Sequence, residues 1–161
     1  MGNIIQVGMA DYKLARSPDK LMTAALGSCI GICLLDPASK IAGMSHIMLP
    51  YSQEDKKFTK QAKYADTAII AVLAAMEKMG ADCRHLVAKI AGGAQMFQFA
   101  GESDIFKIGE RNALAVESNL EKNKIKLLNK DIGGNVGRTI IFDPATGDLY
   151  IRTIRHGEKV I

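Results

Sequence analysis

The chain has 161 residues, of which 48% are hydrophobic and 24% are charged, and its net charge is +4. These values are typical of one soluble globular domain, here residues 1–161, and they permit an acidic partner without requiring one. The longest apolar run, Thr67–Met76, is far shorter than the roughly 20 residues of a membrane-spanning helix. The chain does not begin with a basic region and an apolar core, and it has three cysteines. We therefore expect a cytoplasmic protein with free thiols and no membrane insertion.

Two apolar runs in the first third of the chain predict a β-hairpin, preceded by short strands at Ile4–Val7 and Tyr12–Ala15. The runs are Cys29–Leu35 and Lys40–Leu49. Between them lies Asp36-Pro37-Ala38-Ser39, and proline after aspartate favours a type I turn. This hairpin is the segment around which we expect the protein to be organised.

The rest of the chain alternates helices with strands. A polar, Lys-rich loop at Tyr51–Lys63 leads into an amphipathic helix at Ala62–Met79, which Gly80 is placed to cap. Further on, the pattern predicts a strand at Leu86–Ala91, a helix at Glu110–Lys122 and a strand at Lys124–Leu128. A second hairpin is predicted for Arg138–Phe142 with Leu149–Ile154. The pattern assigns no element to 94–100. The expected fold class is α+β: an α/β sandwich with a mostly antiparallel sheet and two main helices on one face.

The hairpin brings a thiol close to an imidazole. If Leu35 pairs with Lys40 across the turn, Cys29 lies opposite His46, and opposed residues have Cβ atoms about 4.5–5.5 Å apart. That separation suits a cysteine nucleophile whose proton is taken by His46 as general base. A register shift of one residue would place the two side chains on opposite faces of the sheet.

Structural roles are the alternatives for both residues. The sequence Gly27-Ser28-Cys29-Ile30-Gly31 matches a nucleophile elbow with Cys in place of Ser, but an elbow requires a helix after the turn, and Pro37 comes too soon. A lone cysteine is otherwise a small core residue, and a histidine in an apolar strand is otherwise a hydrogen-bonded structural residue. Structural roles are expected for four further residues: Cys33, Cys83, His85 and His156.

A third polar group should orient the imidazole, and the nearby side chains that can do so are the hydroxyls of Thr23, Ser28 and Ser45. Thr23 lies six residues before Cys29, which is roughly 20 Å along a straight strand. It can therefore help only if the chain bends at Gly27-Ser28. Gly92-Gly93 and Gly133-Gly134-Asn135 allow either tight turns or close approach of the backbone to a ligand.

Other classes of site have weak signals. No spacing of His, Cys and Asp indicates a metal, and no cofactor is expected. The segment Lys56–Lys60 contains one aromatic residue and is better explained as solvated surface than as a nucleic-acid site.

Several blocks of sequence, in one order, closely resemble the CheD family of chemoreceptor glutamine deamidases from bacterial chemotaxis. The resemblance runs from Val7-Gly8-Met9-Ala10 to the last hairpin. Its blocks are LGSC (Leu26–Cys29), AGMSHIMLP (Ala42–Pro50), KYADTAI (Lys63–Ile69), AKIAGGAQMF (Ala88–Phe97), IGERN (Ile108–Asn112) and DIGGN-x-GRTI (Asp131–Ile140).

The resemblance implies a catalytic triad of Cys29, His46 and Thr23 that deamidates receptor glutamines through a thioester. It implies an α/β sandwich akin to the cytotoxic necrotizing factor toxins. Backbone N–H groups are then the candidates for binding the oxyanion or the substrate, at Gly27, Ser28, Gly92 and Gly93.

Two partners are also implied: the cytoplasmic helical bundle of the chemoreceptor and the chemotaxis phosphatase CheC. The rival interpretations are a non-catalytic adaptor that binds CheC or the receptor, and a thiol hydrolase of small amides.

Overall fold

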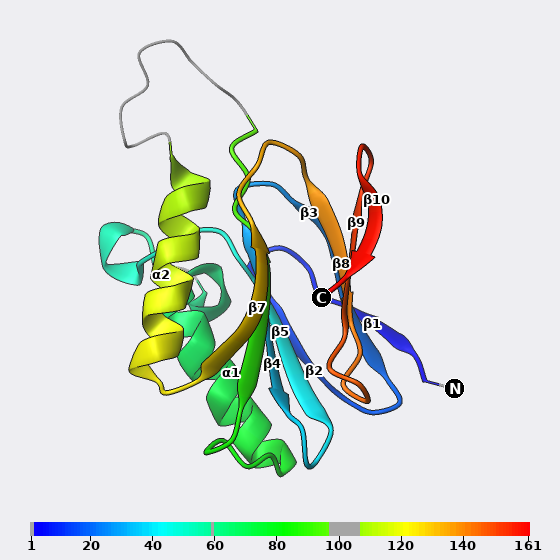
Figure 1. The fold of residues 1–161 in the computed structure, drawn as a ribbon. Coiled ribbons are helices and arrows are strands. Elements are labelled where there is room, and N and C mark those ends of the chain that lie inside the picture. The colour runs from blue at the N-terminus through cyan, green and yellow to red at the C-terminus, as the bar shows by residue number, and fades with distance from the viewer. Residues whose placement is uncertain (1, 59, 97–106) are drawn as a thin grey trace.

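The computed structural model describes residues 2–58, 60–96 and 107–161. Thr59 in the Lys-rich loop, Phe97 in the AKIAGGAQMF block and the end of the unassigned 94–100 segment lie outside the described residues. Within those ranges the chain forms two five-stranded sheets and two α-helices, arranged in three layers (Figure 1). The coarse prediction of an α+β protein with two main helices is confirmed.

One sheet lies on the outside of the molecule and the other in the middle. The outer sheet has the strand order β1 (Ile4–Gln6), β3 (Lys20–Leu26), β8 (Arg138–Phe142), β9 (Leu149–Thr153) and β10 (Gly157–Val160). The central sheet has the order β2 (Tyr12–Arg16), β5 (Ile41–Ile47), β4 (Ile30–Asp36), β6 (Val87–Gly92) and β7 (Lys126–Ile132). Both sheets are mixed, because β1 runs parallel to β3 and β6 runs parallel to β7.

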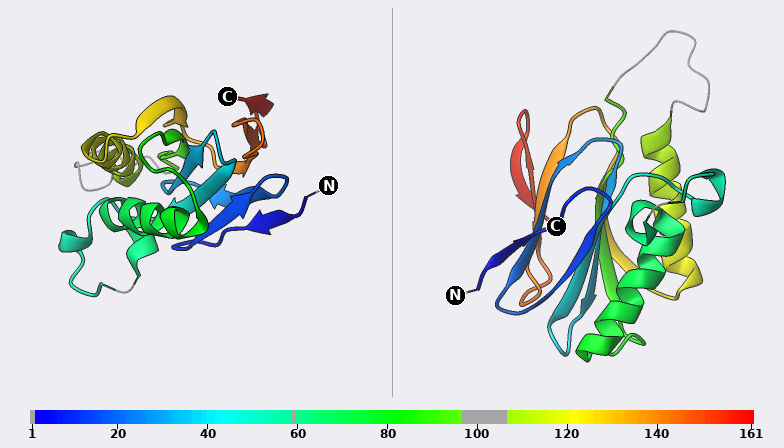
Figure 2. Two further views of the ribbon diagram at one scale, coloured as in Figure 1. Left: turned by 90° about the horizontal axis from the view of Figure 1, so that it is seen from below. Right: turned by 180° about the vertical axis from the view of Figure 1, so that it is seen from behind.

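Helices α1 (Ala65–Met79) and α2 (Ile108–Lys122) cover the face of the central sheet that points away from the outer sheet (Figure 2). Two short 3-10 turns, η1 (Ser52–Glu54) and η2 (Gln61–Lys63), precede α1, so this helix begins three residues later than predicted. Gly80 caps α1 at φ +109°, as its position indicated. None of the helices in the described ranges has the length and apolar character needed to span a membrane.

The central sheet is covered on both faces, so β4 and β5 are buried along their whole length and are mostly apolar. Alternate residues of β4 contribute to two cores. Ile30 and Ile32 pack with the helices, whereas Cys33 and Leu35 pack with residues of the outer sheet. The space between the two sheets is therefore a core of its own, and its upper end in Figure 1 contains the candidate site.

The predicted hairpin is present as β4 and β5, but the predicted register is wrong by two residues. Gly31, rather than Cys29, lies opposite His46. The turn itself explains the difference, because 37–40 all lie in the turn, whereas the prediction counted Lys40 as the first paired residue of the second strand. A shift of two residues preserves the face of the sheet, so Cys29 and His46 still point toward the outer sheet.

The prediction of one sheet was incomplete because Lys20–Leu26 forms a separate strand. β3 pairs with β1 and β8, and the chain bends and crosses to the central sheet before Ile30. The separation of roughly 20 Å between Thr23 and Cys29, which assumed one straight strand, therefore does not apply. β10 was also missed, since its residues are all exposed and show no apolar alternation.

The other predicted elements are confirmed with small changes at their ends. These are Leu86–Ala91 as β6, Glu110–Lys122 as α2, Lys124–Leu128 as β7, and the second hairpin as β8 and β9. Lys56, Lys57 and Lys60 of the Lys-rich loop are exposed, in agreement with a solvated surface, whereas Lys63 is partly buried and pairs with Asp55.

Candidate active site

Cys29 lies where the chain crosses from the outer sheet to the central sheet. Its carbonyl accepts a hydrogen bond from the N–H of Gly93 (2.9 Å). Gly92, at φ +120°, packs so closely that a Cβ there would lie 2.2 Å from the carbonyl oxygen of Cys29. The two glycines therefore fix the position of the Cys29 backbone, Gly93 by a hydrogen bond and Gly92 by a contact that only a residue without a side chain allows. Cys29 is 8% exposed, beside the partly exposed Gly27 and Ser28, so it lies just beneath the surface.

His46 lies on β5 and is 1% exposed. Its backbone N–H donates to the carbonyl of Asp11 (3.0 Å), and its carbonyl accepts from the N–H of Ala10 (2.9 Å). The N-terminal segment 7–11 thus fixes the backbone of the histidine, which gives the first block of the family resemblance a structural role.

Thr23 on β3 reaches His46 across the space between the sheets. Its hydroxyl oxygen lies 2.7 Å from Nδ1 of His46 and 2.7 Å from the carbonyl oxygen of Val7. A carbonyl only accepts, so the single hydroxyl proton of Thr23 goes to Val7, and Nδ1–H of His46 donates to Thr23. This tautomer leaves Nε2 of His46 with a free lone pair, which is the form that a general base requires.

A β-bulge in β3 places Thr23 for this contact. The pairing of β3 with β8 shifts between Thr23 and Leu26, and Ala25 has φ +59°. Ala24 and Ala25 are both exposed, while Thr23 and Leu26 are both buried. The extra residue therefore lets both flanking side chains point into the core between the sheets.

The thiol of Cys29 and the ring of His46 share a face but form no hydrogen bond. Cys29 directly precedes β4 and lies diagonally across from His46, which is opposite Gly31, and diagonal neighbours of this kind are roughly 7–8 Å apart, within reach of an aromatic side chain. Within the described residues, the buried Nε2 of His46 has no hydrogen-bond partner. Burial raises the pKa of the Cys29 thiol and lowers the pKa of the His46 imidazole. The resting pair is therefore a neutral thiol and a neutral imidazole rather than an ion pair.

The backbone N–H groups of Ser28 and Cys29 are available beside the thiol. In the part of the chain that the structure describes, neither donates to a backbone carbonyl, although the N–H of Cys29 lies near its own sulfur. The N–H of Gly27 donates to the carbonyl of Ala25 (3.1 Å), and the N–H of Gly93 is used by Cys29. Of the sequence candidates, Ser28 thus presents a donor that no backbone carbonyl of the described residues uses, whereas Gly27 and Gly93 shape the backbone.

Asn112 on α2 is a site residue whose role the sequence did not reveal. It is fully buried, and its Nδ2 donates to the carbonyls of Ser28 (2.9 Å) and Met48 (3.0 Å). One amide group thereby joins the residue before Cys29 to the residue that directly follows β5, the strand that carries His46. The IGERN block contains Asn112, but only the fold shows what its side chain contacts.

Arg138 is a second residue that sequence reasoning missed. It is 7% exposed, and its guanidinium donates to the carbonyls of Gly92 (3.2 Å) and Gly133 (2.9 Å) and to Asp131 (3.2 Å). It therefore joins β8 of the outer sheet to the ends of β6 and β7, next to the glycines that seat Cys29.

Other candidate residues are not brought to the site. Cys33 is fully buried in the same core, and burial raises the pKa of its thiol. Cys83 is partly exposed at the edge of the helical core, and His85 and His156 are exposed. Gly133 and Gly134 have φ of +86° and +73° and form a tight turn.

The fold and the site define an α+β protein that gathers a thiol, an imidazole and a hydroxyl between two sheets. Residues 48–153 match the family described as CheD chemotactic sensory transduction. The chain is 61% identical over 161 residues to the "Probable chemoreceptor glutamine deamidase CheD" of Syntrophomonas wolfei, and both chains are covered in full. It is 53% identical, again over the full length of both chains, to a protein of the same name from Desulfitobacterium hafniense.

The chain is also 49% identical over 162 residues to the "Chemoreceptor glutamine deamidase CheD" of Halalkalibacterium halodurans, with complete coverage of both proteins. The protein therefore belongs to the CheD family.

Proposed function

We propose that this protein hydrolyses the side-chain amide of chemoreceptor glutamines, with Cys29 as nucleophile, His46 as general base and Thr23 as the residue that orients the base. The observation that carries the proposal is the hydrogen-bond chain from Val7 through Thr23 to His46. It leaves Nε2 of His46 as a free base on the face that Cys29 shares. The names of the relatives support the choice of substrate.

The first step transfers the Sγ–H proton of Cys29 to Nε2 of His46 while the sulfur attacks the amide carbon of the substrate glutamine. The C–S bond forms, and the electron pair of the carbonyl moves to oxygen. Because the resting pair is neutral, the proton moves only when the substrate brings the two groups into line. The imidazolium then keeps its Nδ1–H on Thr23.

The tetrahedral intermediate carries its negative charge on oxygen and needs hydrogen-bond donors. The N–H groups of Ser28 and Cys29 are the candidates, since both are unused by backbone carbonyls of the described residues. When the intermediate collapses, Nε2–H of His46 protonates the leaving nitrogen. The C–N bond breaks, ammonia leaves, and a thioester remains on Cys29.

Hydrolysis repeats these steps with water. Nε2 of His46 takes a proton from the water molecule as its oxygen attacks the thioester carbon. The C–S bond breaks, the sulfur of Cys29 recovers its proton from His46, and the product is a glutamate side chain. A hydroxyl stabilises the imidazolium less than a carboxylate would, which suits a slow regulatory enzyme.

The chemoreceptor as substrate and CheC as a regulatory partner complete the proposal, together with a cytoplasmic location and a fold akin to the cytotoxic necrotizing factor toxins. Both proposed partners are proteins, and the proposal includes no cofactor. A purely adaptor role would leave the Thr23–His46 contact with a structural role alone.

The test is ammonia release from a purified cytoplasmic receptor fragment. We expect turnover by the natural chain and none by Cys29→Ala or His46→Ala. Cys33→Ala is the matched control, because Cys33 lies in the same core four residues further along the chain. Full turnover by Cys29→Ala would contradict the proposal, and receptor binding without ammonia release by the natural chain would favour the adaptor.

A further inference from the structure

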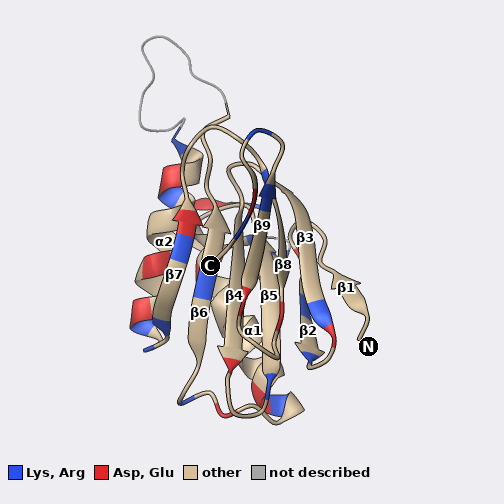
Figure 3. Ribbon diagram, turned by 45° about the vertical axis from the view of Figure 1, so that its right-hand side comes forward, with Lys and Arg blue, Asp and Glu red and all other residues tan. Residues whose placement is uncertain are grey.

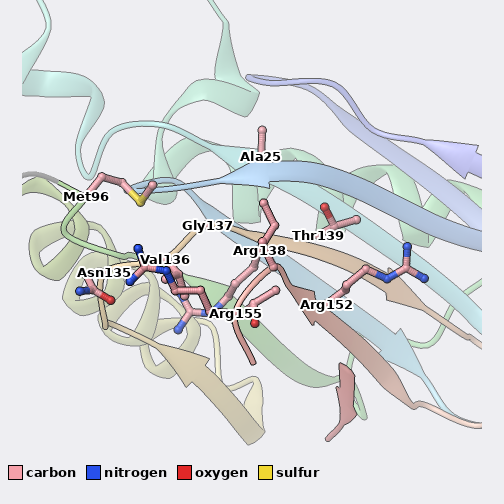
Figure 4. Close-up of a pocket in the computed structure, with 11 residues that line it drawn as sticks. Ala25, Met96, Asn135, Val136, Gly137, Arg138, Thr139, Arg152 and Arg155 are labelled. Atoms are coloured by element: carbon pink, nitrogen blue, oxygen red, sulfur yellow. The ribbon is translucent and has the colours of Figure 1, made fainter. Parts of the chain in front are cut away.

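A groove of about 740 Å³ lies beside the candidate active site, at the end of the outer sheet. It is lined by residues from β3, from the segment that begins β8 and from the turn after β9 (Figure 4). Figure 4 shows Met96 and Asn135 toward one end, Arg152 toward the other, and Arg138 and Arg155 between them. The volume is in the range of sites that bind part of a ligand or a peptide segment.

The groove has basic side chains along its length, of which Arg155 is the one without an ion-pair partner among the described residues. Three arginines line it, and none of the lining residues within the described part of the chain is acidic. Arg138 pairs with Asp131 (3.2 Å) and donates to two backbone carbonyls, and Arg152 pairs with Glu158 (2.6 Å) on the exposed surface. Arg155 is exposed. Basic residues also mark the end of β9 and the following turn in Figure 3.

Apolar side chains between these charges remain in contact with water. Met96 is 46% exposed, and Ile154 in the turn is fully exposed. A methionine adapts its shape to different apolar partners, and exposed apolar side chains near a groove are typical of a surface that binds another chain.

The groove is connected to the catalytic residues by the backbone. Ala25, which lines it, belongs to the bulge that aims Thr23 at His46. Met96 packs against Gly27, because a Cβ on this glycine would lie 3.3 Å from the methionine Cγ. A segment that lies in the groove is thus next to the chain that leads into Cys29.

We propose that this groove binds a carboxylate-bearing segment of the receptor next to the glutamine that is deamidated. The inference rests on the proposed deamidase function and adds the surface that selects the substrate. Arg155 attracts a carboxylate directly, and Arg152 can exchange its exposed pair with Glu158 for a carboxylate of the segment, while Met96 and Ile154 contact apolar side chains of the same segment. The reaction itself makes glutamates, so a segment that is already partly deamidated fits the groove better than one that is not.

The test compares steady-state kinetics on the receptor fragment for the natural chain and for the double variant Arg152→Gln/Arg155→Gln. We expect KM to rise about 5- to 10-fold with little change in kcat, since exposed charges contribute to association rather than to chemistry. Raising the salt from about 50 to about 300 mM should raise KM for the natural chain and much less for the double variant. Arg152→Lys/Arg155→Lys should restore most of the lost affinity.

Arg84→Gln is the matched control, because Arg84 is an exposed arginine in the turn between α1 and β6, at the opposite end of the molecule from the groove (Figure 1). An unchanged KM in the folded double variant, or an equal rise in Arg84→Gln, overturns the groove proposal. So does a loss of self-association in the double variant, which would assign the groove to a second copy of the chain. If Cys29→Ala still releases ammonia, the deamidase mechanism fails instead.

Discussion

The hydroxyl of Thr23 and the ring of His46 meet at 2.7 Å although they belong to different sheets. Thr23→Val keeps the shape of the side chain but leaves Nδ1 of His46 and the carbonyl of Val7 without a partner. We expect this variant to lose about 1–3 kcal/mol of unfolding free energy. Its kcat should fall by about 10- to 100-fold, because the base is no longer held in one tautomer.

Thr23→Ser is the control for that change, since it keeps the hydroxyl and should retain most of the activity and stability. Urea unfolding and ammonia release measure the two effects. Natural activity in Thr23→Val would show that Thr23 does not orient His46.

Asn112 and Asn119 offer a matched pair on α2. Both are buried, but the side chain of Asn112 bridges Ser28 and Met48, whereas the side chain of Asn119 donates to Ala115 on its own helix (2.8 Å). We expect either change to alanine to cost about 1–3 kcal/mol of stability.

The kinetic effects of the two substitutions should differ. Asn112→Ala should also lower kcat about 10-fold or more at temperatures where it is folded, because a small misplacement of the nucleophile is costly. Asn119→Ala should leave kcat unchanged. Equal kcat in both variants would reduce Asn112 to a purely structural residue.

Local sequence patterns were sufficient to predict most of the elements, because turns and apolar periodicity are local signals. The β4–β5 hairpin, both helices and the β8–β9 hairpin were found in this way. The division into two sheets was not, since β3 carries no clear alternation and one of its two partners, β8, lies more than 100 residues further along the chain. The residues of a single strand do not indicate which distant strand it pairs with.

The site was predicted in part for the same reason. The prediction that Cys29 and His46 share a face was correct although the predicted register was wrong by two residues, because a shift of two residues keeps each side chain on the same face of the sheet. The route by which Thr23 reaches His46 could not be predicted, because it depends on a bulge and on the packing of two sheets. Asn112 acts from α2 through side-chain contacts that no spacing in the sequence encodes.

The buried imidazole of His46 should make stability depend on pH. Burial lowers its pKa in the folded protein below the unfolded value of about 6.5. The unfolded chain therefore binds a proton more readily, and the stability that is present above about pH 6.5 is lost as the pH falls through the folded pKa. We expect the unfolding free energy of the natural chain to fall more steeply than that of His46→Gln between about pH 7.5 and pH 5.

Urea unfolding at several pH values measures this slope. His85 and His156 are exposed and common to both proteins, so they cancel in the comparison. Parallel slopes for the two proteins would mean that His46 is not held neutral by burial.

The thiol of Cys29 should react slowly at neutral pH. Burial raises its pKa, so little thiolate forms at pH 7, and the rate of alkylation by iodoacetamide should climb through the alkaline range. The measurement needs a Cys33→Ala/Cys83→Ala background in which Cys29 is the remaining cysteine. A fast alkylation rate that is already constant below pH 7 would indicate a preformed thiolate–imidazolium pair instead.

The most direct test of the whole account is mass spectrometry of receptor peptides after incubation with the protein. We expect a gain of about one dalton at particular glutamines with the natural chain and with Cys33→Ala, and no gain with Cys29→Ala or His46→Ala, because conversion of the amide to an acid requires the thioester on Cys29. The same gain produced by Cys29→Ala, or no gain with the natural chain on a receptor fragment that it binds, would contradict the account.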